Sequence, residues 1–417
     1  MRPTRPEIDF DHNSPAFAAD PHAHLHRARE TCPLAWSGHN GGYWVATGYE
    51  AMTEIARDDA RFSSQRERPG DGNALAIPSM PSIEQIPIEL DPPAFHVYRN
   101  MLNPILSPAA IDKRKPHIAR WVTWCIDRFI ERGECDLVLD FASPVPALST
   151  MEWMGLPLDQ WERFAGPLHA VVSEKPGTAA YDQAFVDLLW LNDQLLATAR
   201  ARRAEPRDDV VSWIVTRTVD GRPVNDVEAV SILSLFLVGG VDTTTSLTGQ
   251  TLAWLAAHPA VRQRLIADPG LIANATEEFL RYFTPVTGLA RRVTGDTVAC
   301  GQALKRGERI WIGWAGANRD PAFFNRPDEL DIDRFPNRHA TFGLGAHRCA
   351  GSTFARAMFH EMLGQILARL PDYTVDASRT THYPSQGVNT GLSRLAARFT
   401  PGPRIGPDTG TTPAACG

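Results

Sequence analysis

The most specific pattern in this chain is TFGLGAHRCAG, residues 341–351. Its three glycines allow a tight loop whose backbone can approach another group closely. Residues 352–370 follow directly and have the apolar spacing of a helix. We therefore expect Cys349 at a helix N-terminus, where the dipole and free amide groups favour a thiolate. A thiolate there could be a nucleophile, a zinc ligand or an iron ligand, although no CxxC or HxxxH partner lies at zinc spacing. A buried inert cysteine is the remaining alternative.

A second unusual stretch, residues 226–258, is predicted to be one long helix capped by Asp226. At ~1.5 Å per residue it would run about 50 Å. Its first half is apolar on nearly every face, so we expect it to cross the middle of the protein. Its midpoint nevertheless holds Gly239 and Gly240, each of which costs about 1 kcal/mol relative to Ala, followed by the polar residues 242–245. The residues alone leave two interpretations, a tight helix crossing with back-bonded hydroxyls or a functional site.

The apolar spacing predicts a mainly α chain with a smaller β-containing lobe. Helices are predicted at residues 121–132, 157–168, 179–203 and 226–258. Strands are predicted at residues 42–47, 291–298, 309–312 and 392–399. No internal repeat or linker is visible, so we predict one domain over residues 19–399. The ends, 1–18 and 400–417, are rich in Pro, Gly and Thr and are predicted to be poorly ordered.

Composition narrows the class of protein. A chain of 417 residues with 43% hydrophobic content can bury a large core. A net charge of -6 gives no reason to expect nucleic acid or an anionic membrane as partner. The first residues lack the apolar core of a secretory signal, and the longest apolar run is far shorter than the ~20 residues that span a bilayer. Six cysteines without disulfide rhythm indicate free thiols. We predict a cytoplasmic, soluble, monomeric protein.

The glycine-rich loop resembles the haem-binding signature of the cytochrome P450 family, F-x-x-G-x-[HR]-x-C-x-G. The positions of the signature are filled without a gap by Phe342, Gly345, His347, Cys349 and Gly351. The resemblance implies that haem b is the cofactor and that Cys349 is the axial ligand of its iron, a device that favours O–O cleavage. It further implies that Phe342 packs near the sulfur, that Gly343 belongs to the same cofactor-binding loop, and that loop amides tune the potential of the iron.

The midpoint of the long helix, GGVDTT at residues 239–244, resembles the oxygen-binding motif of the family, [AG]-G-x-[DE]-T-[TS]. The resemblance implies that Gly239 and Gly240 leave room for dioxygen over the haem. It implies that Thr243 donates a hydrogen bond during oxygen activation and that Asp242 relays protons from solvent. With this match, a functional site is favoured over a mere helix crossing.

Glu278-Phe-Leu-Arg281 resembles the E-x-x-R helix of the family, whose spacing places acid and base on one helix face. Taken alone, such a pair is most often an ordinary exposed ion pair. Residues 327–336, PDELDIDRFP, resemble the meander that precedes the haem loop, with Leu330 in place of the usual aromatic residue. The resemblance implies that Arg334 completes a buried network with Glu278 and Arg281 that supports the haem loop.

The two haem propionates are anions that need basic partners. By position, the resemblance assigns Arg291, His347 and Arg99 to them. Arg99 ends DPPAFHVYR, residues 91–99, which is similar to the D-P-P-x-H-x-x-x-R helix of the family. Phe95 occupies the expected His position and His96 is shifted by one, so the contact of His96 with a propionate depends on the structure.

The resemblance implies a bacterial-type monooxygenase with the single-domain cytochrome P450 fold. It would insert one oxygen atom of dioxygen into a hydrophobic organic substrate, with electrons from NAD(P)H through ferredoxin and ferredoxin reductase. Two alternatives are peroxide-driven oxygenation, against which the Asp242–Thr243 pair argues, and a haem-binding sensor, against which the absence of a fused effector domain argues. Residues expected to line the substrate pocket, each of which could equally be plain core, are Ile77, Met80, Ile83, Leu235, Val238, Val286, Thr287 and Leu289.

Overall fold

The computed structural model describes residues 5–407, which form two compact units. The first unit comprises the described residues up to Arg99 together with Glu277–Cys349 and Pro384–Thr390. The second unit comprises Asn100–Thr276, Ala350–Tyr383 and the described residues from Gly391 onward. Each unit is assembled from separate stretches of the chain, which is why the sequence contains no linker at a unit boundary.

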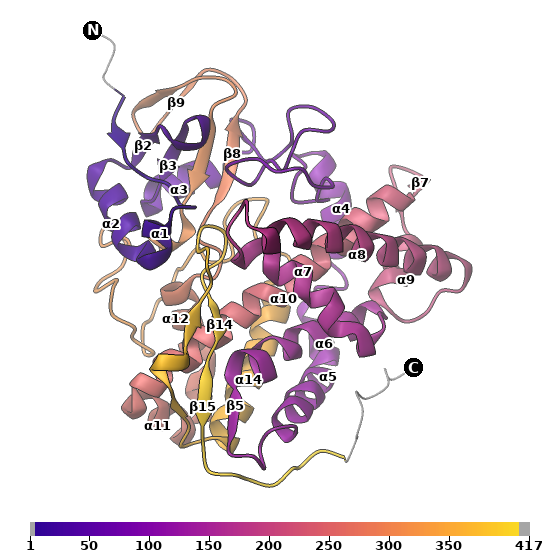
Figure 1. The fold of residues 1–417 in the computed structure, drawn as a ribbon. Coiled ribbons are helices and arrows are strands. Elements are labelled where there is room, and N and C mark those ends of the chain that lie inside the picture. Colours follow the sequence, from indigo (N-terminus) through magenta and orange to yellow (C-terminus); the bar gives the residue numbers. More distant parts are fainter. Residues whose placement is uncertain (1–4, 408–417) are drawn as a thin grey trace. The chain divides into compact units, whose positions relative to one another are not determined.

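The first unit is built on a six-stranded mixed sheet with the strand order β1-β2-β3-β11-β8-β4 (Figure 1). The strands are β1 (Glu7–Ile8), β2 (Leu34–Ser37), β3 (Tyr43–Ala46), β4 (Phe62–Ser63), β8 (Leu289–Val293) and β11 (Arg309–Ile312). β11 pairs parallel with β3, Ile310 opposite Trp44, and antiparallel with β8. Trp44, Ile310 and Ile312 are buried in one core cluster, because the central strands are covered on both faces.

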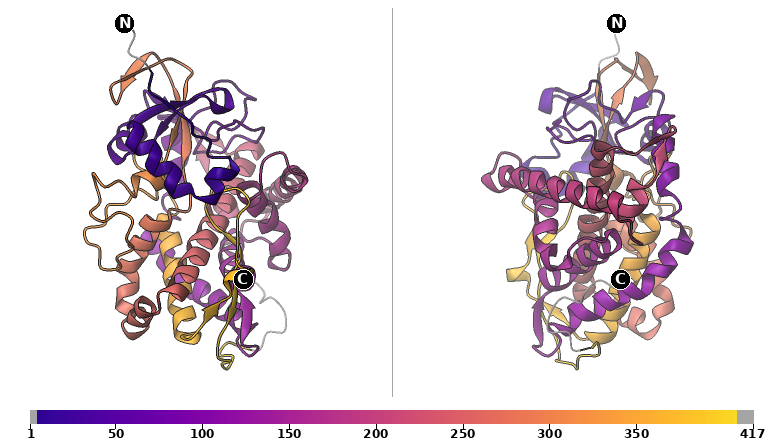
Figure 2. Two further views of the ribbon diagram at one scale, coloured as in Figure 1. Left: turned by 60° about the vertical axis from the view of Figure 1, so that its left-hand side comes forward. Right: turned by 90° about the vertical axis from the view of Figure 1, so that its right-hand side faces the viewer.

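Short helices and a hairpin complete the first unit. The helices are α1 (Pro15–Ala19), α2 (Pro21–Thr31), α3 (Tyr49–Ala56) and α13 (Trp314–Ala317), and the hairpin joins β9 (Thr297–Ala299) to β10 (Gln302–Leu304). α2 contacts β2, and both belong to the indigo N-terminal segments in Figure 2. Two further helices, α4 (Ala94–Leu102) and α12 (Ile272–Phe283), contain the points where the chain passes between the units.

The second unit is mainly helical. Its helices are α5 (Pro108–Asp127), α6 (Pro144–Met154), α7 (Trp161–Ser173), α8 (Ala179–Ala204), α9 (Val210–Val215), α10 (Asp226–Ala257), α11 (Pro259–Ala267) and α14 (Ser352–Arg369), with a π-helical segment over Leu137–Ala142. Its strands are β5 (Glu134–Asp136), β6 (Thr218–Val219), β7 (Arg222–Pro223), β12 (Thr374–Val375), β13 (Thr381–His382), β14 (Leu392–Arg394) and β15 (Ala396–Arg398). α10 packs against α6, α7, α8 and α14 and is therefore the central helix of the unit. The prediction of a mainly helical protein with a smaller sheet region is confirmed.

α10 has the length that the sequence predicts but a different cap. Asn225 is the N-cap: its side chain accepts from the Glu228 amide, while the Glu228 carboxylate accepts from the Asn225 amide. The prediction that Asp226 caps the helix is wrong, because this reciprocal pair satisfies two backbone donors and a lone Asp226 would satisfy one. Within residues 5–407, α10 is also the one helix long and apolar enough to cross a membrane; most of that apolar window is buried, as in the core helix of a globular protein.

Residues 5–18 and 400–407, which the composition predicts to be poorly ordered, make defined contacts within their own units. β1 pairs with β2, and Phe10 and Phe17 are fully buried in the core of the first unit. At the other end, the Gly402 amide donates to the Ile130 carbonyl and the Gly406 amide to Asp127. Buried aromatic rings and tethered backbone groups outweigh a composition that favours loops. The remainder of each predicted end, 1–4 and 408–417, lies outside the described residues.

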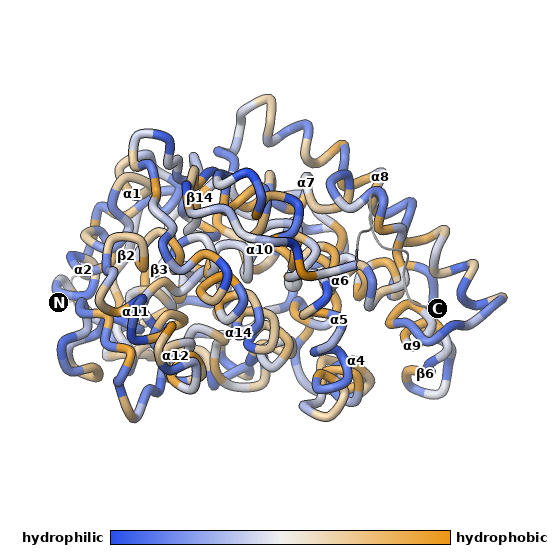
Figure 3. The backbone as a smooth tube through the Cα atoms, turned by 90° about the horizontal axis from the view of Figure 1, so that it is seen from below, coloured by the Kyte–Doolittle hydropathy of each residue, from blue (hydrophilic) through white to orange (hydrophobic). Residues whose placement is uncertain are grey.

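Two helices, α8 and α5, illustrate when the spacing of apolar residues predicts the bounds of a helix and when it does not. α8 carries its buried residues on one face, and hydrophilic and hydrophobic positions alternate along it in Figure 3. The sequence therefore located it almost to the residue. α5 begins at Pro108, well before the predicted residue 121, because its first half is polar and contains Pro116, which hides the helical spacing.

Candidate functional site

The cysteine loop of the first unit turns back on itself. The Cys349 amide donates to the Phe342 carbonyl at 2.7 Å. Gly343 and Gly345 have φ of 70° and 72°, a left-handed region that favours glycine. A Cβ on Gly345 would lie 2.4 Å from the Ala56 carbonyl oxygen, so this position also needs close backbone approach. Gly351, with φ of -82°, is the N-cap of α14.

Basic side chains surround this loop within the first unit. The His347 side chain is 2% exposed, and its Nε2 lies 3.7 Å from the carboxylate of Asp59. Burial, and then the charges of Arg291 and Arg99, lower the pKa of His347 to about 3. Arg291 is itself buried, and burial lowers its pKa to about 10 despite the attraction of Asp59. Burial also lowers the pKa of Arg99, although Cys349 acts in the opposite direction. Three basic side chains, His347, Arg291 and Arg99, therefore interact with one another around the loop.

The residues at the shifted His position have separate environments. Phe95 is buried, and its ring lies 4.5 Å from that of His347, centroid to centroid. His96 is exposed, with its ring 5.4 Å from Phe95. The aromatic ring thus packs where the family pattern has an imidazole. The contact of His96 with a propionate stays a prediction.

The structure brings Glu278, Arg281 and Arg334 together in one buried cluster of the first unit. Arg281 donates to both Glu278 oxygens at 2.7 and 2.8 Å, and Arg334 Nε lies 3.0 Å from Oε2. Glu278 also accepts from Asn337 at 3.0 Å and from the Asp331 amide at 2.8 Å. The exposed fractions of the Glu278 and Arg281 side chains are 0%. The cluster ties α12 to the segment that leads into the cysteine loop.

At the midpoint of α10, in the second unit, Asp242 is buried and bonded by residues from two other elements. Asp242 Oδ1 lies 2.5 Å from His169 Nδ1 of α7 and accepts from the Tyr383 hydroxyl at 3.0 Å. Thr243 donates its hydroxyl to the Gly239 carbonyl, one turn earlier, at 3.1 Å. His169 and Tyr383 were missed at the sequence level, because they are 73 and 141 residues from Asp242 and no local motif marks them.

The two glycines of this midpoint differ. A Cβ on Gly239 would meet nothing within 4 Å, as expected of a position that leaves room. A Cβ on Gly240 would lie 2.7 Å from Thr150 Oγ1 of α6. Gly240 therefore permits the close approach of α10 to α6, a packing reason for glycine that the sequence did not indicate.

The residues expected to line a substrate pocket fall into different environments. Ile77 is buried in the core cluster that contains Phe10 and Trp311. Thr287 is fully buried and donates to the Gly387 carbonyl at 2.7 Å, so both side chains have structural partners. Ile83 is 38% exposed. The residues that are half-buried are Met80, Val286 and Leu289 in the first unit and Leu235 and Val238 on α10.

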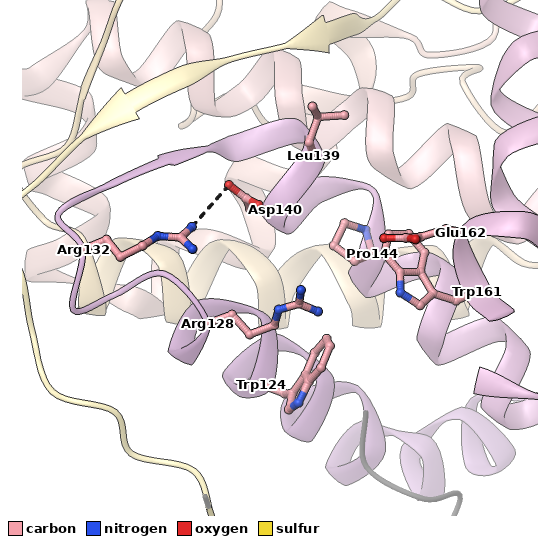
Figure 4. A pocket seen from close by; sticks show the side chains of 8 residues that line it. All are labelled: Trp124, Arg128, Arg132, Leu139, Asp140, Pro144, Trp161 and Glu162. Carbon is pink, nitrogen blue, oxygen red and sulfur yellow. Dashed lines mark ion pairs between the residues drawn. The ribbon is translucent and has the colours of Figure 1, made fainter. Parts of the chain in front are cut away.

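The second unit also has a small surface hollow of about 100 Å³, shown in Figure 4. It is lined by Trp124, Arg128, Arg132, Leu139, Asp140, Pro144, Trp161 and Glu162. Arg132 lies 3.8 Å from the Asp140 carboxylate across one side. None of the predicted site residues lines it, so we do not assign it to the reaction.

Comparison with known proteins identifies the family. The family model described as Cytochrome P450 matches residues 270–382. A steroid C26-monooxygenase of Mycobacterium tuberculosis (strain CDC 1551 / Oshkosh) is 32% identical over 371 residues, 88% of this chain and 97% of the relative. The chain belongs to the cytochrome P450 family. Cyclomarin C epoxidase CymV of Salinispora arenicola (strain CNS-205) is 31% identical, over 83% of this chain and 88% of that protein. The solved structure of Mycobacterium marinum cytochrome P450 CYP268A2 in complex with pseudoionone matches with a TM-score of 0.86 at 25% identity, covering 95% of this chain and 100% of that one.

As a cytochrome P450, the protein is a haem monooxygenase that binds haem b and uses dioxygen on a hydrophobic substrate. The residues of the first unit fit this cofactor. Among the described residues, neither ring nitrogen of buried His347 has a hydrogen-bond partner. Buried Arg291 uses Nη1 on the Ala290 carbonyl and has no carboxylate within ion-pair distance in the described chain. A buried guanidinium without a carboxylate partner is costly, and a propionate of haem b would supply the anion for Arg291.

Proposed function

We propose that Cys349 is the thiolate ligand of the haem iron and that the basic residues around it bind the propionates. The observation that carries this proposal is the loop itself: Cys349 follows a glycine turn, folds back onto Phe342, and lies among buried Arg291 and His347. Arg99 and His96 complete the basic set by the motif they occupy. When bound, haem supplies the iron centre at which dioxygen is reduced and one oxygen atom is transferred to the substrate.

The supporting roles follow from the same contacts. Glu278, Arg281 and Arg334 hold the segment that leads into the cysteine loop, so they act on the position of Cys349 and not on the substrate. In the second unit, Thr243 provides a hydroxyl group for oxygen activation. The carboxyl group of the adjacent Asp242 carries the protons. Both roles rest on the motif at residues 239–244.

We further propose that electrons come from NAD(P)H through a ferredoxin and its reductase. From their positions in the sequence, in the cysteine loop and in the segment that begins near Asp91, the basic residues that we propose for donor binding are Arg99, Lys113, Arg114, Lys115, Arg338 and Arg348. Arg114 forms an ion pair with Glu152, with Nη2 3.4 Å from Oε2, so its substitution is a poor test of docking. Lys113 and Lys115 on α5 are exposed and better suited. Lys115 Nζ lies 2.7 Å from Asp112, but both side chains are exposed, and such surface pairs contribute little.

Reversing the charge of Lys113 and Lys115 together should slow ferredoxin-driven reduction at low salt and leave substrate affinity unchanged. Steering of an acidic partner weakens with salt because the Debye length is only about 8 Å at physiological ionic strength. The matched control is Arg398→Glu on β15, whose side chain is 79% exposed. If the rate of first-electron transfer changed neither with salt nor with the charge reversal of the two lysines, α5 would be excluded as a docking surface.

The substrate is proposed to be a neutral hydrophobic molecule. The relatives are named for a steroid, for cyclomarin C and, in a bound complex, for pseudoionone. The residues proposed for its pocket are mostly aliphatic, which suits such a molecule, and Ile77 and Thr287 are the weakest members because each has structural partners. We also propose that the protein acts as a cytoplasmic monomer. No disulfide joins the five cysteines within residues 5–407, as expected in a reducing compartment.

The experiment that tests the ligand is the spectrum of the reduced carbon monoxide complex. Cys349→Ala should lose the far red-shifted Soret band of thiolate ligation and all oxygenase activity. Cys32→Ala, at a half-buried cysteine, is the control and should retain both. A Cys349→Ala protein that kept the thiolate-type band would show that another residue binds the iron.

A further inference from the structure

A buried chain of side chains in the second unit leads to Asp242. Ser143 Oγ, just before α6, lies 2.7 Å from His169 Nε2. The other ring nitrogen of His169, Nδ1, lies 2.5 Å from Asp242 Oδ1, and the Tyr383 hydroxyl donates to the same oxygen at 3.0 Å. α7, which carries His169, packs against α10, which carries Asp242 (Figure 1). Four side chains from four separate segments therefore form one continuous hydrogen-bonded set.

The exposed fractions of these side chains indicate where a proton can enter the hydrogen-bonded set. The Asp242 side chain is 2% exposed, whereas that of His169 is 22% exposed. Tyr383 is buried, and burial together with the neighbouring Asp242 raises its pKa well above 10. Tyr383 therefore keeps its proton and serves as a fixed hydrogen-bond donor. His169 is the member of the set that reaches both water and the Asp242 carboxylate.

An imidazole can accept a proton on one ring nitrogen and release another from the second, which a serine or amide side chain in its place cannot do near neutral pH. The two nitrogens of His169 already have different partners, Nε2 toward Ser143 and Nδ1 toward Asp242. A hydroxyl can donate or accept, so Ser143 suits either protonation state of the ring.

We propose that His169 is the positioning residue that holds Asp242 and supplies it with protons from solvent, an inference that rests on the proposed role of Asp242. A proton from water enters at Nε2, and the proton on Nδ1 passes to Asp242 Oδ1. Asp242 becomes neutral and the ring keeps one proton, now on Nε2. When the ring turns its exposed edge to solvent, water protonates Nδ1 and takes the proton from Nε2, which restores the Nδ1–H form with no other reactant.

The order Ser143–His169–Asp242 is also that of a hydrolytic triad. In a triad the serine must meet the substrate, so it has to be accessible. Here Ser143 is 8% exposed and is less accessible than the histidine. The exposure therefore favours proton entry at His169 over attack by Ser143.

The kinetic test uses the haem-loaded protein with a plant-type [2Fe–2S] ferredoxin and its reductase at saturation. NADH-driven oxygen consumption is measured in H₂O and D₂O for His169→Asn, which keeps a donor near the Nδ1 position but cannot relay. Because a positioned proton-transfer group contributes on the order of 10²–10⁴-fold, and His169 acts through Asp242, we expect kcat to fall at least about tenfold with a larger solvent isotope effect. The matched control is Ser173→Ala, whose hydroxyl bonds the His169 backbone carbonyl and neither ring nitrogen; it should behave as wild type.

A second readout does not depend on activity. In the diamagnetic reduced carbon monoxide form, ¹⁵N-labelled histidine spectra should contain a protected Nδ1 proton that is absent from His169→Asn. The same proton should lose its protection in Asp242→Asn. A protected signal that Asp242→Asn leaves unchanged would overturn the pairing.

The outcomes separate this inference from the proposed function. If Asp242→Asn were slow while His169→Asn kept the wild-type rate and isotope effect, His169 would be excluded from the proton path. The role of Asp242 would be unaffected. If Asp242→Asn itself behaved as wild type, neither Asp242 nor His169 would have a role in proton delivery.

Discussion

The substitution Glu278→Gln should destabilise the protein strongly. The Glu278 carboxylate neutralises Arg281 and Arg334 in the interior of the first unit, and Asn337 and the Asp331 amide add further donors. Glutamine retains one acceptor oxygen and turns an NH₂ group toward guanidinium donors. Removing one member of a buried ion pair costs about 3–5 kcal/mol, because the remaining charge stays buried. A typical domain has a total stability of roughly 5–15 kcal/mol, so a large part of the margin would be lost.

Urea unfolding of the haem-loaded protein, followed by far-UV circular dichroism, measures this loss. The matched control is Glu329→Gln in the same segment, a 61% exposed carboxylate 2.9 Å from Arg326, which should change stability by less than about 1 kcal/mol. A Glu278→Gln protein within about 1 kcal/mol of wild type would refute the reasoning. It would mean that the backbone carbonyls of Asn318, Pro327 and Glu329, which also accept from Arg281, are sufficient to hold the charge.

Three further predictions follow from single contacts. Gly240→Ala should cost about 1–3 kcal/mol by overpacking against Thr150, and Thr150→Ala should recover most of it in the double variant; equal instability of the single and double variants in urea would contradict the contact. Thr243→Ala should fold normally, because its hydroxyl donates to the Gly239 carbonyl of the same helix, but should release peroxide in place of product; unchanged product per NAD(P)H would remove its role. Burial lowers the pKa of His12 to about 4 against the attraction of Asp11, so between pH 6.5 and 4 the unfolded chain binds a proton that the folded chain does not. The free energy of unfolding should therefore fall as pH falls through this window, and His12→Gln should flatten that slope; an identical slope in the variant would show that His12 is protonated in the folded protein.

Features that depend on short contiguous patterns could be predicted from the sequence alone. The cysteine loop at residues 341–351 could be located because glycines at left-handed positions and a following helix are local requirements of the backbone. α10 and α8 could be located because apolar residues recur with the helical period over many turns. The roles of Cys349, Asp242 and Thr243 needed the family resemblance as well, because the residues alone allowed several kinds of chemistry.

Tertiary structure decided which side chains meet. The partners of Asp242 come from α7 and from the turn after β13, and no periodicity links segments 73 and 141 residues apart. Gly240 is required by Thr150 of another helix, and Phe95 packs on His347 from a distant loop. Residues 5–18 and 400–407 are held in place because Phe10, Phe17 and the Gly406 amide have partners elsewhere in their own units. Hydrogen bonds, burial and close packing depend on the distance between side chains in space. A pattern in the amino-acid sequence predicts that distance only for residues within a few helical turns of each other.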